Sequence, residues 1–236
     1  MAQSQPIEIA DVAARLQAQS ARPLLIGVTG SVAVGKTHFA DALAAALAPD
    51  VATLSTDGFL LPNAVLVDRG LVLKKGYPES YDADAMLATL AALRTGAVMV
   101  PVHSHVSYDI DPALARCVGP AAFVIVEGLG LSGFGDGRSA RAALDLLIYL
   151  DADPGDIEAW YVARFLGLWR AGADDPGSFY HRFATRPEAD VVALAQHTWS
   201  TINRPNLESH IVHARASADI VLHKTADHRL LWQSLQ

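Results

Sequence analysis

Short apolar runs alternate along the chain with longer segments in which apolar residues recur at helical intervals. Runs that are apolar at nearly every position are typical of strands buried on both faces of a parallel sheet. They lie at 23–29, 51–56, 123–128, 144–151 and 218–223, with a weaker strand prediction at 98–104. Helical spacing predicts helices at 36–47, 82–94, 153–171 and 187–203, after an amphipathic N-terminal helix at 7–20.

This alternation predicts an α/β fold in which a doubly wound, mostly parallel sheet carries helices on both faces. Ligands of such sheets bind at the carboxyl ends of the strands. The polar residues at those predicted ends are Thr29, Asp57, His103, Glu127 and Asp151. No repeat or linker divides the chain, so we expect one domain over residues 1–236, in which residues 1–22 precede the first strand.

The composition is that of an ordinary globular protein, with 51% hydrophobic and 18% charged residues. A net charge of −7 disfavours nucleic acid and anionic membranes as partners, because both attract basic surfaces. The chain has no basic leader and no apolar segment long enough to span a bilayer, so we expect a cytoplasmic protein. Cys117 is the one cysteine, and we expect it to be a small buried residue.

Residues 30–37, GSVAVGKT, match the phosphate-binding pattern G-x-x-x-x-G-K-[ST] between a predicted strand and a predicted helix. Backbone N–H groups of such a loop hold phosphates, the lysine reaches the β- and γ-phosphates, and the hydroxyl binds Mg²⁺. The pattern predicts ATP and Mg²⁺ as cofactors in a fold of the P-loop NTPase type; the plainer alternative is a glycine turn without a ligand. The predicted nucleotide-binding residues here are Gly30, Ser31, Val32, Ala33, Val34, Gly35, Lys36, Thr37 and His38.

Two carboxylates follow predicted strands near this loop. Asp57 is placed to take the proton of an attacking hydroxyl or to order a metal-bound water, and its alternative is a common Asp-Gly turn. Glu127 ends the strand 123–128, where P-loop proteins often place a carboxylate directed at the metal. The alternative for Glu127 is an acidic residue at the edge of a strand.

Two further groups of residues are each open to two interpretations. Lys74 and Lys75 face either a substrate or solvent. A second group comprises His103, His105 and Tyr108, and its spacing resembles that of a metal-ligand pair. Because Mg²⁺ prefers oxygen ligands, we interpret these residues either as hydrogen-bond donors to a substrate or as part of a loop whose polar groups already have partners.

On the helix 153–171, Tyr161, Arg164, Phe165 and Leu168 share a face. An aromatic stripe is typical of core. A buried arginine among them, however, needs an anionic partner, which a transferring phosphoryl group supplies.

Together these stretches resemble type I pantothenate kinase, in the branch of P-loop kinases that includes uridine kinase and phosphoribulokinase. The resemblance runs from about Leu24 to His228. It is carried by GSVAVGK, TDGFLLPNAVLVDRGLVLKKGYPESYD, PVHSHVSYD, EGL, WYVARF, INRPNL and ARASADIVLHKTADH. It implies phosphorylation of the terminal hydroxyl of pantothenate with MgATP, the first step towards coenzyme A, by a protein that forms homodimers.

The resemblance also implies roles for individual residues. Lys36 matches the P-loop lysine, Asp57 the general base, and Arg164 the arginine that stabilises transferred charge. The residues that match hydrogen-bonding positions for pantothenate are His105, Tyr108, Tyr161 and Asn203, and those that match its apolar wall are Phe165, Leu168, Phe179 and Tyr180. His228 matches a residue that stacks on adenine, and Lys224 lies just before it.

Four departures from the family pattern bear on function. Thr37-His38 replaces Ser-Thr and keeps a hydroxyl for the metal. Asp41 stands where the family has an arginine that meets the phosphates of inhibitory coenzyme A, so feedback inhibition stays open. His103 replaces a tyrosine beside the substrate, and the shorter segment before the first strand leaves nucleotide preference open. Two alternatives therefore remain: a kinase of the same fold for a sugar, polyol or nucleoside, and a non-catalytic nucleotide-binding regulatory module.

Overall fold

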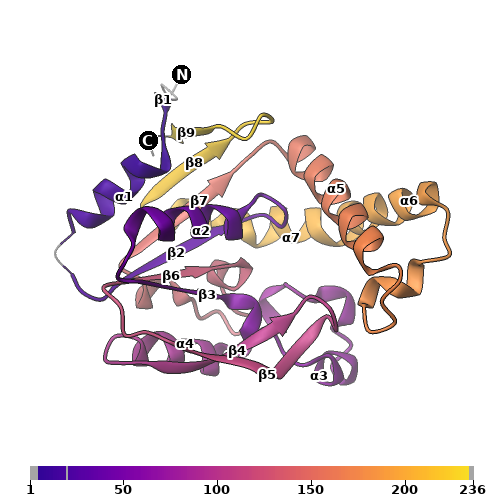
Figure 1. Cartoon of the computed structure of the whole chain (residues 1–236), viewed down its shortest axis with the longest axis horizontal. Helices are drawn as coiled ribbons and strands as arrows, with labels where there is room; N and C mark the ends of the chain where they lie inside the picture. The colour runs from indigo at the N-terminus through magenta and orange to yellow at the C-terminus, as the bar shows by residue number, and fades with distance from the viewer. Residues whose placement is uncertain (1–4, 20, 234–236) are drawn as a thin grey trace.

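The computed structural model describes residues 5–19 and 21–233 and contains a seven-stranded sheet in the order β1-β9-β8-β7-β2-β6-β3 (Figure 1). Its strands are β1 Gln5–Pro6, β2 Leu24–Gly30, β3 Val51–Ser55, β6 Phe123–Glu127, β7 Leu146–Asp151, β8 Ile220–Lys224 and β9 Leu230–Gln233. Residues 1–4, 20 and 234–236 belong to the predicted domain 1–236, and residue 20 also ends the predicted N-terminal helix. All of these lie outside the described residues.

The five strongest strand predictions are confirmed and form the parallel centre of the sheet. Neighbouring strands from β3 through β6, β2 and β7 to β8 are parallel, whereas β9 and β1 pair antiparallel at one edge. Every residue of β2 and β6 is buried, because elements cover both faces of the sheet, and this explains their continuous apolar sequence. Glu127 is in register with Val28 and Ser55, so the ends of three strands meet.

The weaker strand prediction at 98–104 is also a strand, but it lies outside the main sheet. It is β4, Val98–Ser104, which pairs antiparallel with β5, Asp109–Val118, in a separate two-stranded sheet. The expectation that Cys117 is buried is wrong, because it lies exposed on β5. Within the described part of the chain this strand pairs only with β4, and it exposes most of its residues to solvent.

The helices are α1 Ile9–Gln17, α2 Lys36–Leu47, α3 Asn63–Asp68, α4 Ala83–Ala92, α5 Pro154–Gly172, α6 Glu188–Thr198 and α7 Arg204–Ser209. Figure 1 shows α2 in front of the sheet and α7 behind it, which is the doubly wound arrangement. The N-terminal helix follows the short edge strand β1 as well as preceding β2. The helix predicted at 187–203 consists of α6 and a π-helical turn, Trp199–Asn203, which leads into α7.

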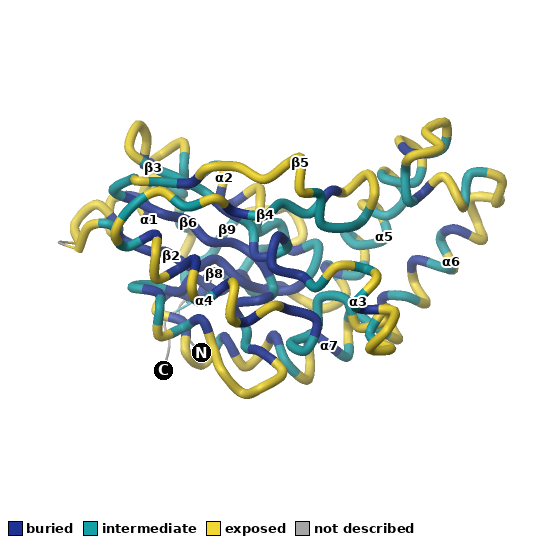
Figure 2. Tube along the Cα trace, turned by 90° about the horizontal axis from the view of Figure 1, so that it is seen from below, coloured by how far each residue is buried: buried dark blue, intermediate teal, exposed yellow. Residues whose placement is uncertain are grey.

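Helices α5 and α6 form an arm that extends beyond the sheet, and Figure 2 shows it as mostly intermediate and exposed. In α5 only Ile157 and Gly172 are buried. Arg164 is exposed, so the expectation of a buried guanidinium is wrong: the helix projects into solvent and does not pack against the sheet along its length.

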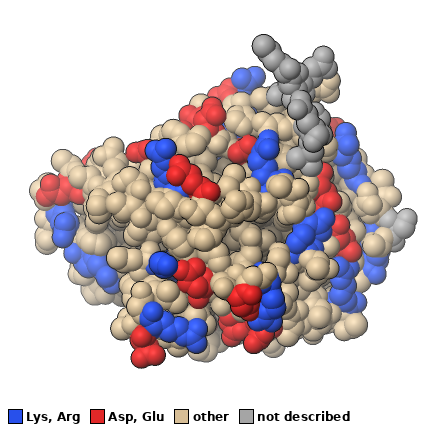
Figure 3. Space-filling view, turned by 180° about the vertical axis from the view of Figure 1, so that it is seen from behind, with Lys and Arg blue, Asp and Glu red and all other residues tan. Residues whose placement is uncertain are grey.

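No helix within the described residues is long and apolar enough to cross a membrane. On the face drawn in Figure 3, acidic and basic side chains are interspersed.

Candidate active site

The loop between β2 and α2 has an unusual backbone that fits a phosphate cradle. Three of its residues have positive φ: Gly30 at +143°, Ala33 at +61° and Gly35 at +100°. A Cβ atom on Gly30 would lie 2.3 Å from the carbonyl oxygen of Leu150, so only glycine fits there. Left-handed conformations are uncommon for residues such as Ala33 and cluster at functional sites. The loop also ends at the N-terminus of α2, where N–H groups without helical partners attract anions.

Lys36 starts α2 and folds back over the loop, where its Nζ donates to the Ser31 carbonyl oxygen at 2.8 Å. Burial lowers the pKa of Lys36, the carboxylates of Glu127 and Asp57 raise it, and the guanidinium of Arg164 lowers it. Each of these charges therefore lies within electrostatic range of the lysine. The two predicted carboxylates and the predicted arginine therefore belong to the electrostatic surroundings of Lys36, although they come from three distant parts of the chain.

Glu127 closes β6 and is only 8% exposed. Burial raises its pKa, Lys36 lowers it, Asp57 raises it, and the hydroxyls of Ser55 and Thr37 lower it. A carboxylate and a hydroxyl side by side are hard oxygen donors of the kind that Mg²⁺ prefers. The residues present therefore fit the predicted metal.

Asp57 lies in the 3₁₀ turn Thr56–Phe59 that follows β3. The Ser55 hydroxyl caps this turn by accepting a hydrogen bond from the Asp57 N–H at 3.3 Å. Gly58 packs directly against the backbone of β4, which brings the separate β4-β5 sheet to the edge of the site.

The β4-β5 hairpin supplies one wall. The His103 ring lies edge-on to His105 at 5.7 Å and to Tyr108 at 5.4 Å. Burial and the nearby charge of Lys75 together lower the pKa of His103 to about 4, against the opposing effect of Asp57. Both ring nitrogens of His103 are buried without a hydrogen-bond partner among the described residues. At neutral pH, His103 is therefore an uncharged group with hydrogen-bonding capacity still to be used.

The arm supplies the opposite wall. Tyr108 stacks on Phe179 at 4.5 Å, and the Phe179 N–H donates to the Val106 carbonyl oxygen at 2.8 Å, so hairpin and arm meet. Burial is the main cause that raises the pKa of Tyr161 to about 12, whereas the nearby Asn203 side chain and the Arg164 guanidinium both lower it. The other aromatic residues of this wall are Phe165 and Tyr180, whose rings lie edge-on at 5.4 Å.

A third group lies on the other side of the phosphate loop. Lys224, at the end of β8, donates to the Val34 carbonyl oxygen at 2.9 Å, and its Nζ lies 4.3 Å from the centre of the Trp160 ring. The His228 ring is tilted by 32° against the same Trp160 ring, at 5.1 Å between centres. Both residues predicted for the adenine side are thus beside the loop, joined by a tryptophan.

Thr29 and Asp151, two of the polar residues predicted at strand ends, form structural contacts. The buried Thr29 hydroxyl donates to the Gly128 carbonyl oxygen at 2.9 Å and ties β2 to the loop after β6. Asp151 forms an ion pair with Arg215 at 3.2 Å and lines a cavity of about 390 Å³ together with Ser31 and Tyr149. The structure therefore gives Thr29 and Asp151 structural contacts instead of a place beside Asp57.

Comparison with known proteins identifies the family. Residues 25–164 match the model of the phosphoribulokinase / uridine kinase family. A pantothenate kinase of Sorangium cellulosum is 45% identical over 218 residues, which cover 88% of this chain and 70% of that protein. One of Streptococcus pneumoniae is 40% identical over 91% of this chain and 73% of that protein. The chain belongs to the pantothenate kinase family. It is an ATP-dependent kinase.

Solved structures support the fold of this pantothenate kinase family member. A structure from Silicibacter sp. TM1040, assigned to a fructose transport system kinase, superposes with a TM-score of 0.70 at 23% identity over 91% of this chain and 98% of that one. Phosphoribulokinase from Rhodobacter spheroides gives a TM-score of 0.52 at 14% identity over 86% of this chain and 70% of that one. Both share the P-loop kinase fold.

Sequence reasoning missed some residues of the site of this kinase. Trp160 lies one helical turn before Arg164, and that spacing was the signal that could have placed it on the same side of α5. Lys75, left open by the sequence, donates to the Tyr108 carbonyl oxygen at 2.6 Å and to Asn63 Oδ1 at 2.8 Å. These contacts of Lys75 with the hairpin could not be predicted from the sequence, because they join segments far apart in the chain.

Proposed function

We propose that this kinase transfers the γ-phosphoryl group of ATP to the terminal hydroxyl of pantothenate. The observation that carries the proposal is the convergence of Lys36, Asp57, Glu127 and Arg164 beside a pocket wall of aromatic and hydrogen-bonding side chains. Relatives at 40% to 45% identity over most of the chain carry the name pantothenate kinase, which supports the choice of acceptor.

Asp57 is the proposed general base. It accepts the hydroxyl proton as the acceptor oxygen bonds to the γ-phosphorus and the bond from that phosphorus to the β,γ-bridging oxygen breaks. Lys36 and Arg164 neutralise charge on the transferred group, and the N–H groups of the phosphate loop hold the triphosphate. Thr37 and Glu127 would hold Mg²⁺, which screens phosphate charge when bound.

The acceptor and adenine assignments are part of the same proposal. Nucleotide contacts come from the loop residues and from Lys224 and His228, which lie beside it. The proposed acceptor-binding residues are His103, His105, Tyr108, Tyr161, Phe165, Phe179, Tyr180 and Asn203, with Leu168 at the apolar edge. The homodimer that the resemblance implies is also proposed.

An acceptor panel tests the function. Purified protein is assayed for ADP formation with pantothenate, sugars, polyols and nucleosides, and we expect pantothenate to have the highest kcat/KM. A sugar or nucleoside with a much higher kcat/KM would overturn the choice of acceptor. ATP binding without stimulation by any alcohol would instead favour the regulatory module.

The variant Asp57→Asn tests the mechanism in the same assay. We expect kcat to fall by about 10²- to 10⁴-fold, the usual contribution of a general base, with the melting temperature nearly unchanged. Asp68→Asn is the matched control, because Asp68 is an exposed residue at the end of α3. Equal kcat for both variants would remove Asp57 from the mechanism.

A further inference from the structure

The π-helical turn Trp199–Asn203 carries Asn203 to the acceptor site. Turns of this kind are rare and occur frequently at functional sites. Trp199 is buried, its ring centre lies 5.9 Å from that of Tyr161, and the Asn203 side chain lies close enough to the Tyr161 hydroxyl to lower its pKa. The turn is therefore a wall of the proposed acceptor pocket, and its position decides where Asn203 points.

A short segment of the chain, residues 75–77, bridges this turn and the β4-β5 hairpin. On one side Lys75 donates to the Tyr108 carbonyl oxygen at 2.6 Å. On the other side the Tyr77 hydroxyl donates to the Ile202 carbonyl oxygen at 2.8 Å, and Asn206 Nδ2 donates to the Gly76 carbonyl oxygen at 3.0 Å. We call residues 75–77 the strap, because they join two walls that no continuous secondary structure connects.

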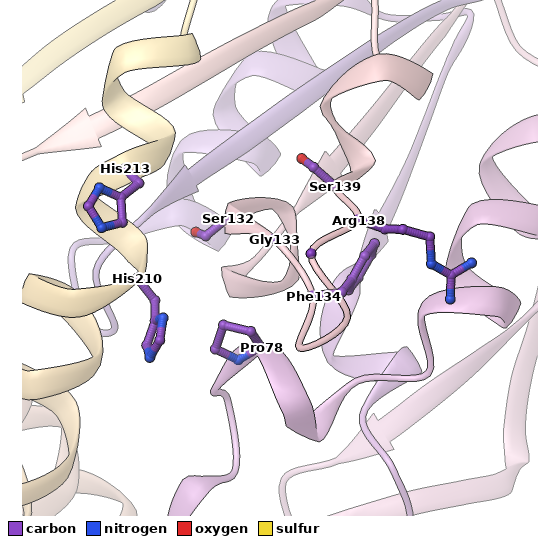
Figure 4. Close-up of a pocket in the computed structure, with 9 residues that line it drawn as sticks. Pro78, Ser132, Gly133, Phe134, Arg138, Ser139, His210 and His213 are labelled. Carbon is purple, nitrogen blue, oxygen red and sulfur yellow. The ribbon is translucent and has the colours of Figure 1, made fainter.

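Hydrogen bonds within its own turn hold the strap locally: the Gly76 N–H donates to Ser80 Oγ at 2.9 Å, and Ser80 Oγ donates to the Tyr77 carbonyl oxygen at 2.7 Å. Figure 4 shows Pro78, which follows the strap, facing His210 and the loop that contains Gly133 and Phe134. The cavity between them has a volume of about 240 Å³. The Tyr77 ring packs edge-on against His210 at 5.5 Å. The hydrogen bonds of Tyr77 and Asn206 are the ones that tie this turn to the π-turn and to α7.

We propose that Tyr77 is a positioning residue for the acceptor. Its hydroxyl fixes the π-turn at Ile202, and this holds the adjacent Asn203 against Tyr161 in the geometry that binds the acceptor. The inference rests on the proposed function, because it assigns Asn203 to the acceptor site. Tyr77 itself touches neither the phosphate loop nor Asp57 among its described contacts, so its effect is on acceptor binding and not on the chemical step.

The variant Tyr77→Phe removes only the hydroxyl and keeps the ring on His210. A hydrogen bond of this kind contributes about 1 kcal/mol, which is about fivefold in a binding constant. We expect KM for the acceptor to rise about fivefold, with kcat and KM for ATP within about twofold of wild type. Tyr149→Phe is the matched control: it removes the same atom from a buried tyrosine on β7 and is expected to leave acceptor KM unchanged.

A double-mutant cycle separates positioning from general stability. If Tyr77 acts through Asn203, Tyr77→Phe adds nothing to acceptor KM in an Asn203→Ala background. An undiminished fivefold effect in that background would overturn the proposal. Acceptor affinity is also measured by calorimetry, which does not depend on turnover. If the protein binds pantothenate without phosphorylating it, the proposed kinase reaction is refuted, and the effect of Tyr77→Phe on acceptor affinity can still be measured.

Amide hydrogen exchange gives a readout that needs no acceptor. In the free protein, we expect Tyr77→Phe to speed exchange of the amides of Ile202, Asn203, Arg204 and Asn206 about fivefold, because the π-turn opens more easily. Unchanged exchange there, or faster exchange with unchanged acceptor KM and affinity, would overturn the positioning role. Should the panel identify another alcohol as acceptor, the same cycle is run with that alcohol.

Discussion

Gly58 is the position where a single methyl group should displace the proposed catalytic base. It follows Asp57 in the turn Thr56–Phe59, and a Cβ atom there would lie 2.1 Å from the Pro101 carbonyl oxygen and 2.9 Å from its carbon. Both obstacles are backbone atoms of β4, so no side chain can rotate away. The turn and β4 must separate by roughly 1 Å, and a misplacement of that size costs about 10²-fold in rate.

We therefore expect Gly58→Ala to lower kcat about 100-fold, measured as ADP formation at saturating ATP and acceptor. The forced contact also costs about 1–3 kcal/mol of stability, which should lower the melting temperature by several degrees. Gly96→Ala is the control, because its Cβ meets no atom within 4 Å. A Gly58→Ala protein with wild-type kcat and wild-type melting temperature would refute the packing argument and the dependence of catalysis on this turn.

Two further outcomes follow from the charges of the site. Arg164→Ala should lower kcat by about 10³-fold with little change in melting temperature, because the arginine is exposed on the arm. Arg170→Ala on the same helix is the control. Near-normal turnover of Arg164→Ala would contradict the assigned role. Burial raises the pKa of Glu127, so its carboxyl takes up a proton at a higher pH than a free glutamate as the solution becomes more acidic. Apparent Mg²⁺ affinity, titrated through turnover, should therefore weaken on acidification at a higher pH than an ordinary glutamate ligand would cause, and an affinity that does not change with pH would argue against Glu127 as a ligand.

The pattern of residues was enough to predict the parallel sheet and the phosphate loop. Continuous apolar runs can be stable only where both faces of a strand are covered, so β2 and β6 were recognisable without any knowledge of their neighbours. The loop was equally local: Gly30, Gly35 and Lys36 act within eight consecutive residues, and the backbone geometry they require belongs to that segment alone.

The rest depended on contacts between segments far apart in the chain. Sequence periodicity placed the run 98–104 among strands but could not say which sheet it joins, because its pairing with β5 and its packing against Gly58 are contacts between different segments. The expectations that Arg164 and Cys117 are buried were wrong, because α5 projects into solvent and β5 is largely exposed. Spacing along one helix or strand fixes which side chains share a face, whereas burial and the partner across a gap are properties of the assembled fold. For that reason the phosphate loop was predictable from the sequence, and the strap that braces the acceptor wall became visible only in three dimensions.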